Sequence, residues 1–181
     1  MIGFDTSVFP RLDPRHPDSF HEKIRAIQEC FEAAGDLGAV KQAARLFLEE
    51  FDRIDPFIQS YTELVCPFCG TVCCAQIHGL PEFADVIGFH ALGHSVPAYD
   101  LTRDLNGPCQ FMGTRGCLLP RTQRPYRCTW YFCDPLLVQI EIGPTSHYRH
   151  FIEMVQALAQ ARGELMRAFF PIWDRYAKSL L

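Results

Sequence analysis

The stretch from Cys66 to Cys74 reads CPFCGTVCC, with four cysteines in nine positions and no charged side chain. Cysteines this dense in a cytosolic protein are typical of metal binding or catalysis, because cytosolic thiols are kept reduced. The odd total of nine cysteines also fits a disulfide scaffold poorly. The stretch therefore predicts a segment organised around thiolates rather than by regular hydrogen-bonded structure alone.

The first half of the stretch is a C-x2-C turn formed by Cys66 and Cys69. Such a turn can place both sulfurs on one ion, and Gly70 is expected to supply the positive φ that the turn tends to need. The geometry suits a tetrahedral zinc ion, with Zn–S distances of ~2.3 Å, and it also suits iron. A redox-active dithiol is the other use of C-x-x-C, but it would need a preceding strand and a βαβ context, and neither is visible.

The adjacent pair Cys73 and Cys74 carries different information. Consecutive side chains in an extended segment point to opposite faces, so both sulfurs reach one small ion only with difficulty. We expect the two residues to serve two sites, or one to bind metal while the other packs.

Eight of the nine cysteines fall in the middle of the chain, in two groups of four. The predicted metal ligands are Cys66, Cys69, Cys73, Cys74, Cys109, Cys117, Cys128 and Cys133. They can form two four-cysteine sites, or one iron–sulfur cluster with spare thiols. The spacing leaves open which cysteines share an ion.

Four arginines and no acid lie between Cys109 and Cys133, namely Arg115, Arg121, Arg124 and Arg127. A four-thiolate zinc site and an oxidised four-iron cluster carry the same negative charge. The arginines are expected to offset that charge and to lower the cysteine pKa values. The alternatives are a solvated surface loop and an anion site for phosphate or nucleic acid.

The cysteine order, with the Arg124-Pro125 step before Cys128, resembles the family that carries the C-x2-C-x3-C-C signature. Its members are described as zinc- or iron-chelating proteins, and the resemblance covers roughly residues 66–133. Pro120 and Thr129 stand where the family tends to have tyrosine and arginine. A similar cluster occurs in bacterial flagellin lysine methylases, where it looks like an iron–sulfur site, so the resemblance implies an enzyme relative. The sequence shows no glycine-rich turn for S-adenosylmethionine, so a methylase activity rests on analogy.

Apolar residues recur at helical spacing on both sides of the cysteine-rich region, which predicts helices with one apolar stripe each. On the N-terminal side, Ser19 and Glu22 form a capping-box pair for a helix that Gly35 ends. Asp36 is expected to cap a second helix that Pro56 closes.

On the C-terminal side, a long helix is predicted from residues 144–146, with a kink or break at Pro171 and a last short helix around residues 173–180. Between the flanks we expect a helix from Pro81 to Leu92 and a short strand at 138–142.

Several other side chains are weaker candidates. His90 and His94 are four apart and His78 follows Cys74, so any of them could bind metal, although such pairs often have one packed and one solvated ring. Cys30 is expected to be a buried apolar residue of the first helix. A lone nucleophile at Cys66 or Cys128 would leave the other seven thiols unexplained.

The composition limits the class of protein. A net charge of −4 and a pI near 5.9 argue against a general nucleic-acid binder. The N-terminus does not read as a signal peptide, and no apolar run approaches the ~20 residues that span a bilayer. We therefore expect a cytoplasmic protein with no membrane contact. A protein partner is compatible with the sequence, but its identity is unknown.

The sequence predicts a mainly α protein of one domain over residues 1–181, whose N- and C-terminal helices pack around an irregular metal-binding region at residues 64–134. The expected cofactor is an iron–sulfur cluster or related iron site, with zinc a close second. The protein is then either a metal-binding module or an enzyme, and a pocket lined by Trp130, Tyr131 and His90 would favour the enzyme.

Overall fold

The computed structural model describes residues 9–70, 73–75, 79–114 and 116–180, and the statements below concern those residues. They form six α-helices and one two-stranded sheet, which confirms the mainly α prediction. The helices are α1 (Pro17–Ala33), α2 (Gly38–Val65), α3 (Phe83–Ala91), α4 (Arg127–Trp130), α5 (Asp134–Ile142) and α6 (Thr145–Ser179). The strands β1 (Met112–Gly113) and β2 (Gly116–Cys117) pair antiparallel, with Met112 opposite Cys117.

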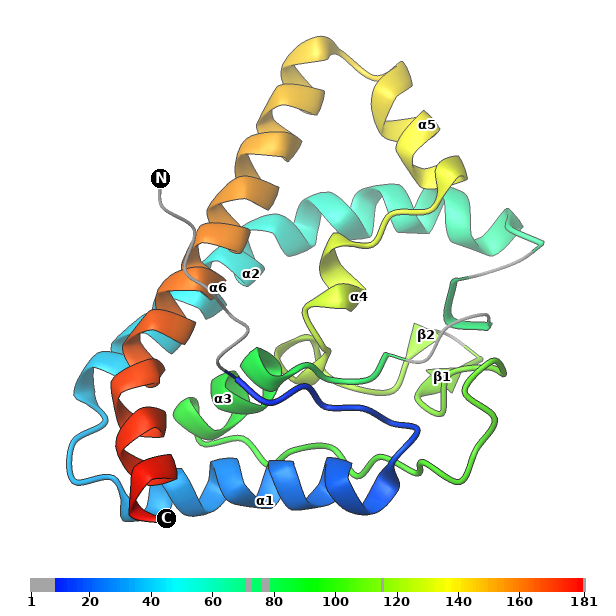
Figure 1. The fold of residues 1–181 in the computed structure, drawn as a ribbon. Helices are drawn as coiled ribbons and strands as arrows, with labels where there is room; N and C mark the ends of the chain where they lie inside the picture. The colour runs from blue at the N-terminus through cyan, green and yellow to red at the C-terminus, as the bar shows by residue number, and fades with distance from the viewer. Residues whose placement is uncertain (1–8, 71–72, 76–78, 115, 181) are drawn as a thin grey trace.

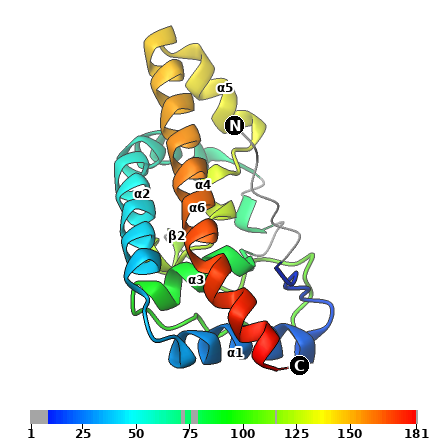
Figure 2. The same ribbon diagram turned by 60° about the vertical axis from the view of Figure 1, so that its left-hand side comes forward.

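The terminal helices form the scaffold. Helix α6 packs most extensively against α2, and α1 and α3 contact each other and α6 (Figure 1). Figure 2 shows α2 and α6 running beside each other, with α1 across their lower end. The cysteine-bearing segments near β1 and β2 lie on the other side of α3 and α4 from α6 (Figure 1).

The predicted apolar stripes of α1, α2 and α6 meet in one continuous core. Phe20 and Ile27 of α1 and Phe169 of α6 are fully buried. The ring of Phe31 stacks on that of Phe169 with centroids 5.1 Å apart. These aromatic side chains hold the helices together, as expected of core residues.

Three of the four predicted helix starts differ from the structure, while α6 begins at Thr145, within the predicted residues 144–146. Helix α1 begins at Pro17, so Ser19 lies inside its first turn and does not cap it. Helix α2 begins at Gly38 with Leu37 at the N-cap position, so Asp36 is not the cap that was expected, although its carboxylate accepts the backbone N–H of Gly38 at 2.8 Å. Helix α3 begins at Phe83 rather than at Pro81, because Glu82 takes the N-cap position.

The prediction that Pro56 ends the second helix is wrong, because α2 continues to Val65 with Pro56 inside it. Ile54 and Ile58 are buried on either side of the proline, while Pro56 itself is exposed. The buried stripe therefore holds the helix together across the proline. The carbonyl that loses its intrahelical bond belongs to Asp52, which is an exposed residue.

Replacing Pro56 with alanine should stabilise the protein by about 1–2 kcal/mol, because alanine restores the missing intrahelical hydrogen bond and removes the ring clash. Urea denaturation checks the change in the free energy of unfolding, with Gln59→Ala at another exposed α2 position as the control. A less stable Pro56→Ala protein would show that α2 needs the proline's bend.

Two further predictions about the C-terminal third are wrong. Residues 138–142 belong to helix α5 instead of a strand, because Leu136 and Ile140 are four apart and both face the core. Helix α6 runs unbroken through Pro171 to Ser179, so no separate last helix forms. Phe169 and Trp173 pack together across the proline, with ring centroids 6.3 Å apart.

Candidate metal centre

The CPFCG stretch continues directly from the end of α2. Cys66–Phe68 form a 3₁₀ turn, and the N–H of Cys69 donates to the carbonyl of Cys66 at 3.2 Å. The predicted tight turn is therefore confirmed. The positive φ expected at Gly70 is not found, since the only described glycines in that region of backbone space are Gly93 and Gly116.

The remaining cysteines come from separate elements that converge on this turn. Cys73 and Cys74 begin a second 3₁₀ turn, Cys73–Ala75. Cys109 lies before β1, and its N–H donates to the carbonyl of Cys74 at 2.6 Å. Cys117 ends β2, Cys128 lies in α4, and Cys133 is the N-cap of α5. The two halves of the cysteine pattern are therefore joined through the backbone.

The first set of interacting thiols is Cys66, Cys69, Cys73 and Cys133. Burial raises the pKa of Cys66, and the neighbouring Cys133 and Cys69 raise it further. Burial raises the pKa of Cys73 to about 12, with a hydrogen bond to Cys133 as the next cause. We call these four residues the first cysteine group.

The second set is Cys74, Cys109, Cys117 and Cys128. Burial raises the pKa of Cys74, followed by the charges of Cys109 and Cys117. Burial raises the pKa of Cys128 to about 12, followed by the charges of Cys74, Cys109 and Cys117. We call these four residues the second cysteine group. We place the adjacent residues Cys73 and Cys74 in different groups by their largest thiol partners, Cys133 for Cys73 and Cys109 for Cys74. The two groups still interact, because Cys74 raises the pKa of Cys73 more than Cys66 does, and Cys66 raises the pKa of Cys74.

The described cysteine sulfurs lie near one another but do not surround a single ion position. Across the described ranges, no three His, Cys, Asp or Glu side chains stand close enough together to hold a single metal ion. The groups are therefore neighbourhoods of thiols, defined by mutual interaction.

A cavity of about 290 Å³ lies against the second group, and its wall includes five cysteines. The other lining residues include Phe111, Met112, Leu119, Arg124, Arg127, Trp130 and Tyr131. A Cβ on Gly79 would come within 2.8 Å of the Cys128 sulfur, so this glycine leaves room for that sulfur at the cavity wall. Cys128 is exposed, and it lines this cavity. Its exposed surface therefore faces the cavity.

The arginines behave differently from the sequence prediction. Arg124 lines the cavity and lowers the pKa of Cys74, but burial outweighs it and the pKa of Cys74 is raised. Arg121 instead pairs with Asp55 of α2, with Nε and Oδ1 2.7 Å apart. Arg115 lies outside the described residues. The expectation that the arginines would lower the thiol pKa values is therefore wrong overall, because desolvation dominates.

The histidines do not form a site among the described residues. His90 packs against the Phe31 ring, with centroids 5.5 Å apart, and burial lowers its pKa. His94 lies beyond the end of α3, after Gly93 with φ of 74°, so the spacing of four residues does not place His90 and His94 on one helix face. His78 lies outside the described residues. Cys30 is 1% exposed within the core, which confirms its assignment as a packed residue.

One residue that holds the site was not singled out from the sequence. Asp85 of α3 is buried, and its carboxylate accepts the N–H of Glu82 at 2.7 Å and the N–H of Tyr126 at 2.9 Å. Tyr126 directly precedes α4, so Asp85 ties α3 to the segment that carries Cys128. The signal in the sequence is the spacing of Glu82 and Asp85 just after Pro81, which is typical of a capping box.

Comparison of the chain with protein-family models, with curated proteins and with solved structures gives no match. Within the described residues, no helix combines the length and the apolar character needed to cross a membrane.

Proposed function

We propose that the protein binds metal through its two cysteine groups, with an iron–sulfur cluster held by the second group, Cys74, Cys109, Cys117 and Cys128. The observation that carries the proposal is the convergence of five cysteines on the wall of one cavity, namely Cys73, Cys74, Cys109, Cys117 and Cys128. Thiolates select zinc and iron–sulfur clusters over harder metals. The first group, with Cys66, Cys69, Cys73 and Cys133, offers a second set of four thiolates.

The donors and the surrounding space fit such a group. All four residues of the second group are thiols, and the adjoining cavity has a volume of about 290 Å³. A single zinc ion draws its sulfurs to ~2.3 Å, whereas a cluster binds each thiolate through a different iron and so accepts a wider spacing.

Zinc is the alternative metal, and the turn at Cys66 and Cys69 favours it in the first group. Four thiolates leave no open coordination position, so zinc there would serve as a structural cross-link. A cluster in the second group would supply one-electron chemistry, tuned by hydrogen bonds and by burial.

An enzyme is the second candidate function, and the cavity favours it. Trp130 and Tyr131 line the cavity beside the second group, as expected for a substrate pocket. His90 does not line it and packs on Phe31 instead. The aromatic wall next to redox-capable thiolates supports a protein-modifying or redox enzyme over a closed module.

The test is a visible absorption spectrum, with iron, zinc and sulfide analysis, of protein purified without air. We expect a brown protein that contains iron and labile sulfide in equal amounts. A colourless protein with stoichiometric zinc would overturn the cluster but keep the thiolate sites. A folded protein that contains and takes up no metal would overturn the function itself.

A further inference from the structure

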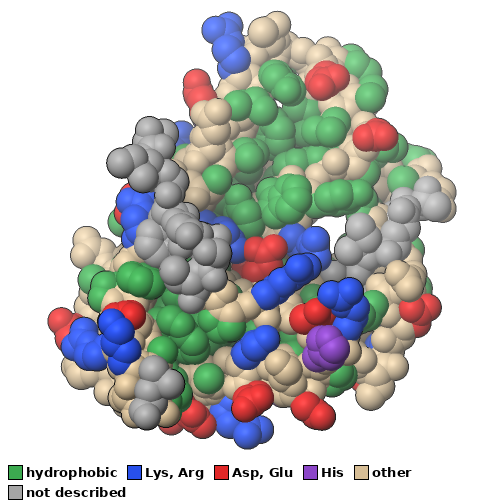
Figure 3. Space-filling model, viewed as in Figure 1, with side chains coloured by type: hydrophobic (Ala, Val, Ile, Leu, Met, Phe, Trp, Pro, Cys, Tyr) green, Lys and Arg blue, Asp and Glu red, His purple; other side chains and the backbone are tan. Residues whose placement is uncertain are grey.

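A second cavity, of about 680 Å³, lies on the face shown in Figure 3. It is bounded by the segment at residues 9–15, by residues 80–84 at the start of α3, and by Arg162 and Met166 of α6. Figure 3 shows basic and acidic side chains gathered at the centre of this face, between hydrophobic areas. The volume lies in the range of pockets that bind small organic ligands.

The charge of this cavity is opposite to that of the chain. Its wall has four arginines (Arg11, Arg15, Arg127 and Arg162) and two acids (Asp13 and Glu82), a net charge of +2. The whole chain has a net charge of −4. A positive cavity in an acidic protein concentrates anions locally.

Both acids are already paired with arginine. Asp13 and Arg15 form an ion pair at 2.8 Å, and Arg15 holds the pKa of Asp13 well below its usual range. Glu82 pairs with Arg162, whose Nε is buried without a hydrogen-bond partner. The described residues therefore leave the guanidinium groups of Arg11 and Arg127 without an ion-pair partner.

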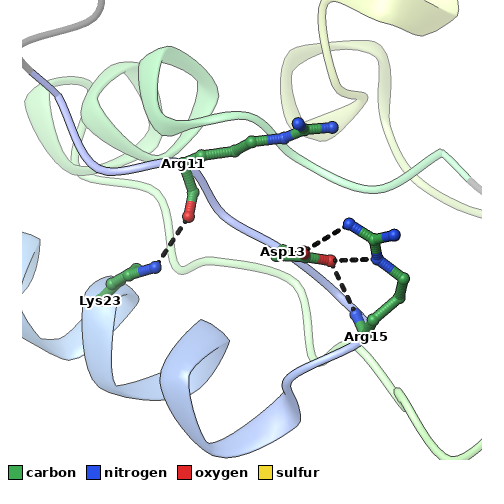
Figure 4. A network of polar contacts seen from close by, with 4 residues as sticks. All are labelled: Arg11, Asp13, Arg15 and Lys23. Atoms are coloured by element: carbon green, nitrogen blue, oxygen red, sulfur yellow. Dashed lines mark hydrogen bonds and ion pairs between the residues drawn. The ribbon is translucent and has the colours of Figure 1, made fainter.

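The segment that carries Arg11 is held in place by polar contacts. Lys23 of α1 donates to the backbone oxygen of Arg11 at 2.9 Å. The N–H of Arg15 donates to Asp13 at 3.1 Å, which fixes the turn that follows. Figure 4 shows no hydrogen bond or ion pair between the Arg11 guanidinium and the other three labelled residues. Its guanidinium is therefore available to a ligand.

The other walls of the cavity are apolar. They include Phe9, Leu12, Phe83 and Met166, and the rings of Phe9 and Phe83 lie 4.9 Å apart. A simple inorganic ion would leave this surface uncovered, whereas an organic anion would bury its body against it.

We propose that this cavity binds a small organic oxyanion, with a phosphate or carboxylate on an apolar body, and that Arg11 and Arg127 bind the anionic group. Guanidinium groups bind both oxyanions through paired, charge-assisted hydrogen bonds. Arg127 also lines the cavity beside the second cysteine group, so the two sites share one wall residue. The proposal needs no metal and stands apart from the metal-binding function.

The test is isothermal titration calorimetry of the full-length protein with 1-naphthyl phosphate, 1-naphthoate, neutral 1-naphthol and inorganic phosphate. At least one of the two organic anions should bind with one site per chain, more than tenfold tighter than naphthol or inorganic phosphate. The preferred anion identifies the natural group as phosphate or carboxylate. Affinity should fall as sodium chloride is raised, because salt screens the charges.

Matched variants locate the site. Arg11→Gln and Arg127→Gln should each weaken binding of the preferred anion about tenfold, the effect of losing one charge-assisted hydrogen-bonding group. Arg149→Gln removes an exposed arginine from the start of α6 and should leave binding unchanged. Metal content and melting temperature show whether Arg127→Gln disturbs the fold. If it does, the affinity of Arg11→Gln for the preferred anion tests the proposal. Binding of neither anion, equal binding of naphthol, or equal effects of Arg11→Gln and Arg149→Gln would overturn the proposal.

Discussion

Replacing Cys128 with serine is expected to remove the metal of the second cysteine group and to leave the metal of the first. Cys128 interacts with Cys74, Cys109 and Cys117, and its sulfur faces the cavity. Serine keeps the size but is a neutral, harder donor that does not replace a thiolate on zinc or iron. Because bound metal stabilises a folded site by about 10 kcal/mol or more, the segment from β1 to α4 should lose its order with the metal.

The matched variant is Cys69→Ser in the first cysteine group. It should remove only the metal of that group, and the double variant should remove both. Metal analysis per chain and thermal unfolding, followed by circular dichroism, measure the two effects.

The control is Cys30→Ala, a change within the core and away from both cysteine groups. It should lower stability modestly and leave the metal content unchanged. Complete metal loss in each single variant would indicate one shared site instead of two. Full metal content with an unchanged melting curve in both serine variants would refute thiolate binding.

Replacing Asp85 with alanine should destabilise the protein by about 3–5 kcal/mol, because two partly buried N–H groups lose the buried carboxylate that accepts both of them. These are the N–H of Glu82 at the start of α3 and the N–H of Tyr126 before α4. Urea denaturation measures the loss. The exposed carboxylate Asp174 provides a control, since Asp174→Ala loses only its surface ion pair with Lys178. Similar losses in the two variants would show that Asp85 has no special structural role.

The same residue makes stability depend on pH. Burial raises the pKa of Asp85 from 3.8 to about 6, although the N–H groups of Glu82 and Tyr126 and the charge of Arg162 oppose the shift. The folded state therefore binds the proton more tightly than the unfolded state. The resulting stabilisation is complete below pH 3.8 and is lost as pH rises through about 6.

Asp85→Asn removes this titration. The stability of the wild-type protein relative to Asp85→Asn should therefore fall as the pH rises from 3.8 through about 6. A difference that stays constant with pH would show that the pKa of Asp85 is not raised.

Apolar residues recur at helical intervals within α1, α2 and α6, and this spacing identified the three segments as helices. Phe20, Val40 and Phe169 belong to these sets, one in each helix, and all three are buried. Proline and β-branched residues misled the interpretation. Pro56 and Pro171 lie inside helices that tertiary packing holds together, and Val138 and Ile140 lie in a helix despite their strand preference.

The candidate site was only partly predictable for a different reason. The turn at Cys66 and the separation of Cys73 from Cys74 follow from local geometry, which spacing reveals. Which thiols become neighbours depends on where α4 and α5 place Cys128 and Cys133, and that is set by contacts between distant segments. The burial of Asp85, too, is a property of the assembled fold.

The peptide that joins Cys73 to Cys74 has a consequence for how the two sites fill. Adjacent Cα atoms are about 3.8 Å apart, so ordering one cysteine leaves its neighbour little freedom. The hydrogen bond from Cys109 to Cys74 extends that restriction to the next segment. If both groups bind metal as proposed, loading either one lowers the entropic cost of loading the other. By thermodynamic reciprocity this cooperativity is the same in both directions, so intermediates with one site filled should be sparsely populated.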